Sequence, residues 1–138
     1  MAIATMEVSY AYLKQQFSPE NSLVQDIMRD IYDELTRGQF TLGPWVDRFE
    51  QVICEKYEVK HCIAVNSGTD ALILSLKAMG IGPGNTVLTV PNTFVATVGA
   101  IVAVGATPVF VDVGDDYQMD LDQAAQYSVD AIIPVHLT

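Results

Sequence analysis

The stretch HCIAVNSGTDALIL, residues 61–74, decides how this chain folds. An apolar run ends at Val65, a small polar turn follows, and apolar residues then recur at helical spacing. This order predicts a strand that enters a helix through the turn Asn66–Thr69.

That turn has the composition of a phosphate site. Ser67 or Thr69 can cap the new helix, and Gly68 allows a ligand to approach the backbone closely. The first N–H groups of a helix have no partner within it and therefore point toward any anion placed there. The same turn is a plain helix cap in many α/β proteins, and the residues alone leave both interpretations open.

Composition limits the class of protein. The chain has 138 residues, half of them hydrophobic, which suits a single globular domain with a core. Seven Lys and Arg against 17 Asp and Glu give a net charge of −10, which argues against binding to nucleic acid or to an anionic membrane. No apolar run approaches the ~20 residues that span a bilayer, and residues 1–12 lack the pattern of a signal peptide, so a cytoplasmic protein is expected. Cys54 and Cys62 show no metal or redox spacing and are interpreted as core thiols.

The order of elements predicts an α/β fold. Leu23, Ile27, Ile31 and Leu35 recur every four residues, which predicts a helix over 22–37 that ends near Gly38. After a loop at 39–43, a second helix begins at Pro44 and ends near Tyr57. Strands are then predicted at 61–65, 87–90, 109–113 and 131–137, and helices at about 70–79, 94–104 and 121–127.

The predicted strands are continuous apolar runs, which are typical of a parallel sheet covered on both faces. We therefore expect one domain over residues 1–138, with a helical segment at 1–60 and an α/β segment at 61–138.

A second polar turn, Pro91–Phe94, follows the predicted strand at 87–90. Thr93 is expected to cap the next helix and to hold Phe94 at its mouth. Because ligands of open α/β folds bind at the carboxyl ends of the strands, a phosphate site beside an aromatic ring would suit a flat, phosphorylated cofactor. Taken alone, Phe94 is more often a core residue than a stacking surface.

Four motifs, in order and at the right spacing, resemble the DegT/DnrJ/EryC1/StrS aminotransferases. They are NSGTDAL at 66–72, GIGPG at 80–84, TFVAT at 93–97 and GATPVFVD at 105–112. GQFTLGP at 38–44 and PVHL at 134–137 agree with them. The resemblance implies a partial three-layer parallel sheet, the N-terminal part of the large domain of a fold-type I pyridoxal phosphate (PLP) aminotransferase. It also implies amino transfer from a donor such as glutamate to a keto-sugar, commonly one linked to a nucleotide.

The resemblance also assigns residues to the cofactor. Gly68 and Thr69 would hold the PLP phosphate in a turn shaped by Ser67, and Phe94 would lie against the pyridine ring. The complete family enzyme is a homodimer, and the segment around Thr41–Pro44 would lie near an active site at the dimer interface.

In the family, the Schiff-base lysine and the aspartate that pairs with the pyridinium nitrogen both come after the motif at 134–137. Lys14, Lys56, Lys60 and Lys77 are interpreted as surface residues that do not replace that lysine. We therefore expect an inactive N-terminal fragment that cannot attach PLP covalently through the expected lysine. The strand at 61–65 would pair with strands that arrive later in the family.

Two other interpretations stay open. The chain is then either a self-standing module that binds phosphate or nucleotide, or a non-catalytic subunit that pairs with a full-length paralogue.

Overall fold

The computed structural model describes residues 16–38 and 43–137 and divides into two compact units, one up to Ile63 and one from Ala64 onward. Lys14 and Thr41 lie outside the described residues. Within these residues no helix is long and apolar enough to cross a membrane.

The described residues of the first unit include two helices with the predicted bounds. Helix α2 spans Ser22–Arg37, and the side chain of Asn21 caps it by accepting a hydrogen bond from Leu23 N–H. It ends at Gly38, whose φ of 71° places it in the left-handed region that favours glycine. Helix α3 spans Pro44–Tyr57 and has proline in its first turn, where no intrahelical donor is lost.

Neither helix of the first unit has a buried residue. The residues Leu23, Ile27, Ile31 and Leu35 of α2 are all exposed, and Trp45 and Phe49 of α3 are exposed as well. The cysteines of this unit, Cys54 and Cys62, are half-buried. The prediction that both are core thiols is therefore wrong, because the helix and loop that carry them pack against too little of their own unit to enclose a side chain.

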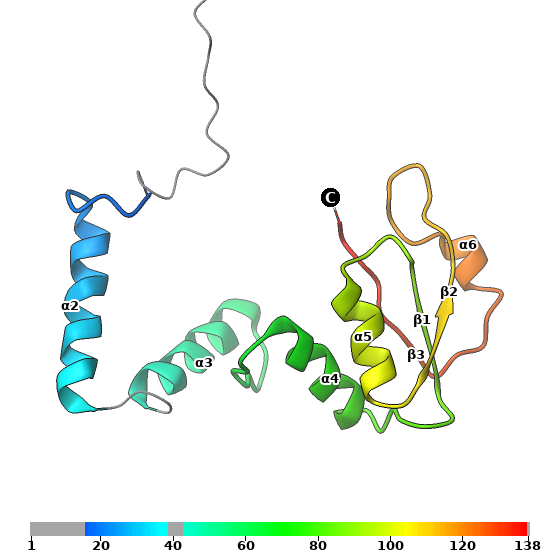
Figure 1. The fold of residues 1–138 in the computed structure, drawn as a ribbon, viewed down its shortest axis with the longest axis horizontal. Helices are drawn as coiled ribbons and strands as arrows, with labels where there is room; N and C mark the ends of the chain where they lie inside the picture. The colour runs from blue at the N-terminus through cyan, green and yellow to red at the C-terminus, as the bar shows by residue number, and fades with distance from the viewer. Residues whose placement is uncertain (1–15, 39–42, 138) are drawn as a thin grey trace, which may run out of the picture. The chain divides into compact units, whose positions relative to one another are not determined.

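The second unit is a three-stranded parallel sheet with helices on both faces (Figure 1). Its elements in order are α4 Gly68–Ala78, β1 Thr86–Thr89, α5 Val95–Ala103, β2 Thr107–Phe110, α6 Leu121–Ala124 and β3 Ala131–Ile132. The strand order is β2-β1-β3, with Leu88 of β1 opposite Val109 of β2 and Ile132 of β3.

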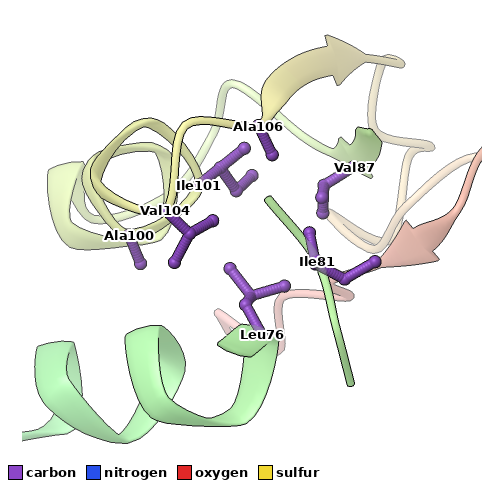
Figure 2. Close-up of a cluster of buried hydrophobic side chains, with 7 residues drawn as sticks. All are labelled: Leu76, Ile81, Val87, Ala100, Ile101, Val104 and Ala106. Carbon is purple, nitrogen blue, oxygen red and sulfur yellow. The ribbon is translucent and has the colours of Figure 1, made fainter. Parts of the chain in front are cut away.

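Strand β1 is the centre of this unit because its side chains supply both layers of core. Val87 belongs to a cluster with Leu76 of α4 and Ile101 of α5, and Figure 2 shows these side chains converging between the two helices and the sheet. Leu88 points to the opposite face and packs in a second cluster with Val111 and with Ala124 of α6. The expected partial three-layer α/β arrangement is therefore present.

Three predicted strands differ from the observed ones. Residues 61–65 are not a strand, and Ile63 is 79% exposed. A strand forms only when a neighbouring strand shares its hydrogen bonds, and among the described residues no strand of the sheet β2-β1-β3 pairs with 61–65. The run at 131–137 pairs only over Ala131–Ile132, and β2 begins and ends earlier than predicted. Burial on both faces holds for β1 but not for β2, which is an edge strand.

Candidate functional site

The turn before α4 is built around the side chain of Ser67. Its Oγ accepts a hydrogen bond of 3.1 Å from Asp70 N–H, and its own hydroxyl donates to Asp70 Oδ2 at 3.0 Å. Ser67 is the N-cap, with extended φ and ψ of −157° and 159°, so of the two predicted caps the structure selects Ser67 over Thr69. The first four N–H groups of a helix have no partner within it, and Ser67 Oγ satisfies one of them, Asp70 N–H.

Two donors of the same turn stay open. Ala71 N–H bonds to Ser67 O and Asp70 N–H bonds to Ser67 Oγ, but within residues 16–38 and 43–137 nothing accepts from the backbone N–H groups of Gly68 and Thr69. A Cβ atom at Gly68 would meet no atom within 4 Å. The turn therefore offers two adjacent N–H groups and free space in front of them, which fits a phosphate group.

The charge around this turn sets a limit on what it binds. The helix dipole places partial positive charge at the first turn of α4 and favours an anion there. Asp70 is the acidic residue of that turn, but its carboxylate is held at Ser67 Oγ, on the capping side. An anion bound by Gly68 and Thr69 must therefore gain more from the N–H groups than it loses to this carboxylate.

The second predicted site residue, Phe94, lies at the start of α5. It is the N-cap of that helix and is 74% exposed. The interpretation of Phe94 as a core residue is therefore wrong, since Phe94 belongs to neither hydrophobic cluster. The prediction that Thr93 caps α5 is also wrong: no side chain caps this helix, and the Thr93 hydroxyl instead lies 2.8 Å from Thr97 Oγ1.

The two turns belong to the same unit and are carried by helices that pack against each other. Leu76 near the end of α4 shares a cluster with Ile101 and Val104 near the end of α5 (Figure 2). Ser67, Gly68 and Thr69 are thus brought together in one turn. In the described part of the chain no hydrogen bond or ring contact joins them to Phe94.

A cavity of about 450 Å³ lies between the loop after β2 and the segment after β3. His136 lines it, and its Nδ1 lies 3.2 Å from Oε1 of Gln118 on the opposite wall. Asp120 also lines it, and the hydrogen bond that its carboxylate accepts from Gln123 N–H holds the pKa of Asp120 below its usual value. The described residues contain no group of three or more His, Cys, Asp or Glu side chains that could hold a metal ion.

The lysines that the structure describes belong to neither turn. Lys56, Lys60 and Lys77 are exposed, and Lys56 lies over the ring of Tyr57 at 5.8 Å. Partial burial, together with the nearby Cys54 and Glu50, raises the pKa of the Cys62 thiol, which lowers the share of the nucleophilic thiolate.

The comparison with known families decides what kind of protein carries this site. The model of the DegT/DnrJ/EryC1/StrS aminotransferase family matches residues 21–138. The chain belongs to this family. The match begins just before α2 and covers both units.

Individual members of the DegT/DnrJ/EryC1/StrS family agree in sequence and in fold. A 3-oxo-glucose-6-phosphate:glutamate aminotransferase from Bacillus subtilis is 36% identical over 121 residues, which are 85% of this chain and 27% of that protein. A DegT DnrJ EryC1 StrS aminotransferase from Brucella abortus superposes with a TM-score of 0.80 at 35% identity, covering 95% of this chain and 37% of that one. NtdA from Bacillus subtilis, solved with bound cofactor PMP, superposes with a TM-score of 0.82 at 33% identity. The match covers 96% of this chain and 32% of that one. The chain thus spans about a third of the length of these family members and corresponds to their N-terminal part.

Two polar residues with structural contacts were missed in the sequence, Thr97 beside the second turn and Asp130 at the opposite end of β1. Thr97 was counted as part of an apolar helix, although its spacing of four residues from Thr93 places both side chains on one face of the helix start. Asp130 was not singled out, and it joins β1 to β3 through Thr86. No local sequence pattern indicates the contact between Asp130 and Thr86, because the two residues are 44 positions apart.

Proposed function

We propose that this chain forms the N-terminal, PLP-binding part of an aminotransferase that transfers an amino group from a donor such as glutamate to a keto-sugar, commonly one linked to a nucleotide. Its family membership supports this, as does the name of the relative from Bacillus subtilis, a sugar:glutamate aminotransferase. The family member solved with PMP supports the cofactor, since PMP is the amino form of PLP.

The observation that carries the proposal is the pair of free N–H groups at Gly68 and Thr69. A phosphate dianion bound there accepts two hydrogen bonds from the backbone and lies at the positive end of α4. The Ser67 hydroxyl stabilises the turn, because it accepts a hydrogen bond from Asp70 N–H and donates one to Asp70 Oδ2. The exposed ring of Phe94 provides an apolar plate that orients a pyridine ring and excludes water from one of its faces.

When bound, PLP supplies the electron-withdrawing ring on which amino transfer depends. The family's Schiff-base lysine and ring-pairing aspartate are expected in the part of the relatives that this chain does not span. The 138 residues alone are therefore proposed to bind the cofactor reversibly and to show no transamination. In the complete enzyme, we propose a homodimer that acts in the cytoplasm, with the segment around Thr41–Pro44 near the shared active site.

The test is a titration of the full chain with PMP, followed by fluorescence anisotropy. PMP is the better probe because it lacks the aldehyde that reacts with exposed lysines such as Lys60 and Lys77. We expect saturable binding that is weakened by Phe94→Leu and by replacing PMP with pyridoxamine, which has no phosphate. Val95→Ala, at a neighbouring residue of equal exposure, is the matched control and should bind as wild type.

A second titration separates this function from the nucleotide-binding module. Free N–H groups at a helix start also fit the phosphates of a nucleotide, so the same samples are titrated with UDP in the absence of PMP. Tight binding of UDP together with no binding of PMP would overturn the proposal in favour of a nucleotide module.

A further inference from the structure

Thr97 is the one polar side chain buried in α5. The helix is otherwise apolar apart from its glycine, and Thr97 is 8% exposed. In the part of the chain that the structure describes, its hydroxyl has a single hydrogen-bond partner, Oγ1 of Thr93 at 2.8 Å. A valine has the same shape and would fill this place without a polar atom, so the hydroxyl needs a reason beyond packing.

Burial makes this hydrogen bond matter for stability. Either hydroxyl can be the donor, and a buried hydroxyl that loses its partner costs free energy. Thr97 is the buried member of the pair, and Thr93 is half-buried.

The turn that Thr93 belongs to has few other attachments. Thr93 N–H bonds to Pro91 O within the turn, and Thr97 N–H bonds to Phe94 O at the start of α5. Neither a side-chain cap nor core packing fixes Phe94, because α5 has no capping side chain and Phe94 is 74% exposed. The hydroxyl pair is thus the side-chain contact that ties the turn Pro91–Phe94 to the buried face of α5.

We propose that Thr97 is a positioning residue, which fixes the backbone at Thr93 through the hydroxyl pair and thereby holds the Phe94 ring in one orientation at the start of α5. What that ring then touches rests on the proposed function; the positioning itself does not. Thr97 acts only through Thr93 and contacts no ligand.

The experiment places 4-fluorophenylalanine at position 94 of the full chain and measures the 19F line width and chemical shift of the ring. We expect Thr97→Val to narrow the line and to move the shift toward that of the free amino acid, because the ring gains motion. Thr93→Val should have the same effect, and the double variant should show no further change, since both substitutions remove one bond. Thr97→Ser keeps the hydroxyl and should retain the wild-type signal.

Ile101→Val is the matched control. It removes one buried methylene from the same helix, so it lowers the stability of α5 without touching the hydroxyl pair. An unchanged 19F signal in both Thr97→Val and Thr93→Val would overturn the proposal, as would an equal change in Ile101→Val. Thr93 is half-buried, so its variant supplies the answer even where Thr97→Val does not fold.

Titration of the same samples with PMP separates the two proposals. Where wild type binds PMP, Thr97→Val should bind about fivefold more weakly, the factor expected when one mobile side chain must be immobilised on binding. Where wild type does not bind PMP, the proposed function fails, and the 19F signal still decides whether Thr97 positions Phe94.

Discussion

The carboxylate of Asp130 accepts a hydrogen bond of 2.7 Å from the backbone N–H of Thr86 and one of 3.2 Å from the Thr86 hydroxyl. Asp130 N–H in turn donates to Thr86 O at 3.0 Å. Thr86 is the first residue of β1 and Asp130 directly precedes β3, so these contacts fix where β3 begins to pair.

This arrangement makes the unfolding of the sheet depend on pH. The hydrogen bond from Thr86 N–H, with a further one from Asn85, holds the pKa of Asp130 below its usual value of 3.8. Because the folded pKa is the lower one, the contact contributes its full stability at pH values above this usual value, and the contribution is lost as the pH falls through the folded pKa. We expect the urea midpoint to fall below about pH 4, and we expect Asp130→Asn to lower it at neutral pH and to flatten this fall. Asp115→Asn, at an exposed loop residue, is the control; an equal effect there would contradict the assignment.

Gly105 and Gly99 provide a matched pair of alanine substitutions. Gly105 has a φ of +82°, and a Cβ atom there would lie 2.9 Å from Cγ of Pro83, so Gly105→Ala should destabilise the fold by about 1–2 kcal/mol or more. Gly99 lies inside α5 with nothing within 4 Å of its Cβ position, so Gly99→Ala should stabilise by about 0.5–1 kcal/mol. Thermal and urea unfolding measure both. Similar midpoints for the two variants would show that Pro83 does not pack as described.

Leu76 and Leu74 test the core between α4 and α5. Leu76 is 1% exposed and belongs to the cluster in Figure 2, so Leu76→Ala should cost about 2–5 kcal/mol. Leu74 lies on the same helix but is 50% exposed, and Leu74→Ala should change stability by about 0.5 kcal/mol or less. Equal losses would mean that the exposed side of α4 is covered in solution.

The turn before α4 can be changed in two ways that separate folding from binding. Ser67→Ala removes the cap and should cost about 1 kcal/mol of stability, with weaker binding of PMP. Gly68→Ala adds a methyl group in open space, so the urea midpoint should stay the same while PMP binding falls, because the methyl stands beside the N–H groups that the phosphate needs. Unchanged PMP binding by Gly68→Ala would place the phosphate elsewhere.

The helices of this chain could be predicted from its sequence because their ends are local. Asn21 and Gly38 lie directly before and after α2, and Pro44 is the first residue of α3. Each end is therefore determined by a residue next to it in the sequence. The Ser67 turn was predictable for the same reason, since its donors and acceptors are three residues apart.

The strands and the second turn were harder to predict because they depend on competition between distant partners. Residues 61–65 have the composition of a strand, yet none of the described strands pairs with them. Thr93 has the chemistry of a cap, yet its hydroxyl pairs with Thr97 instead. Neither outcome follows from residue type, because each depends on which partner lies nearer in three dimensions.

The central position of β1 also has a consequence for the order in which a ribosome releases this chain. The buried residues of β1 are synthesised before β2 and β3. The Thr89 hydroxyl donates a hydrogen bond to the backbone carbonyl of Ile133, which is added 44 residues later. At about 5–20 residues per second, the most buried strand of the sheet stays incompletely covered for several seconds of synthesis. During that interval, the nascent chain presents the kind of surface to which chaperones bind.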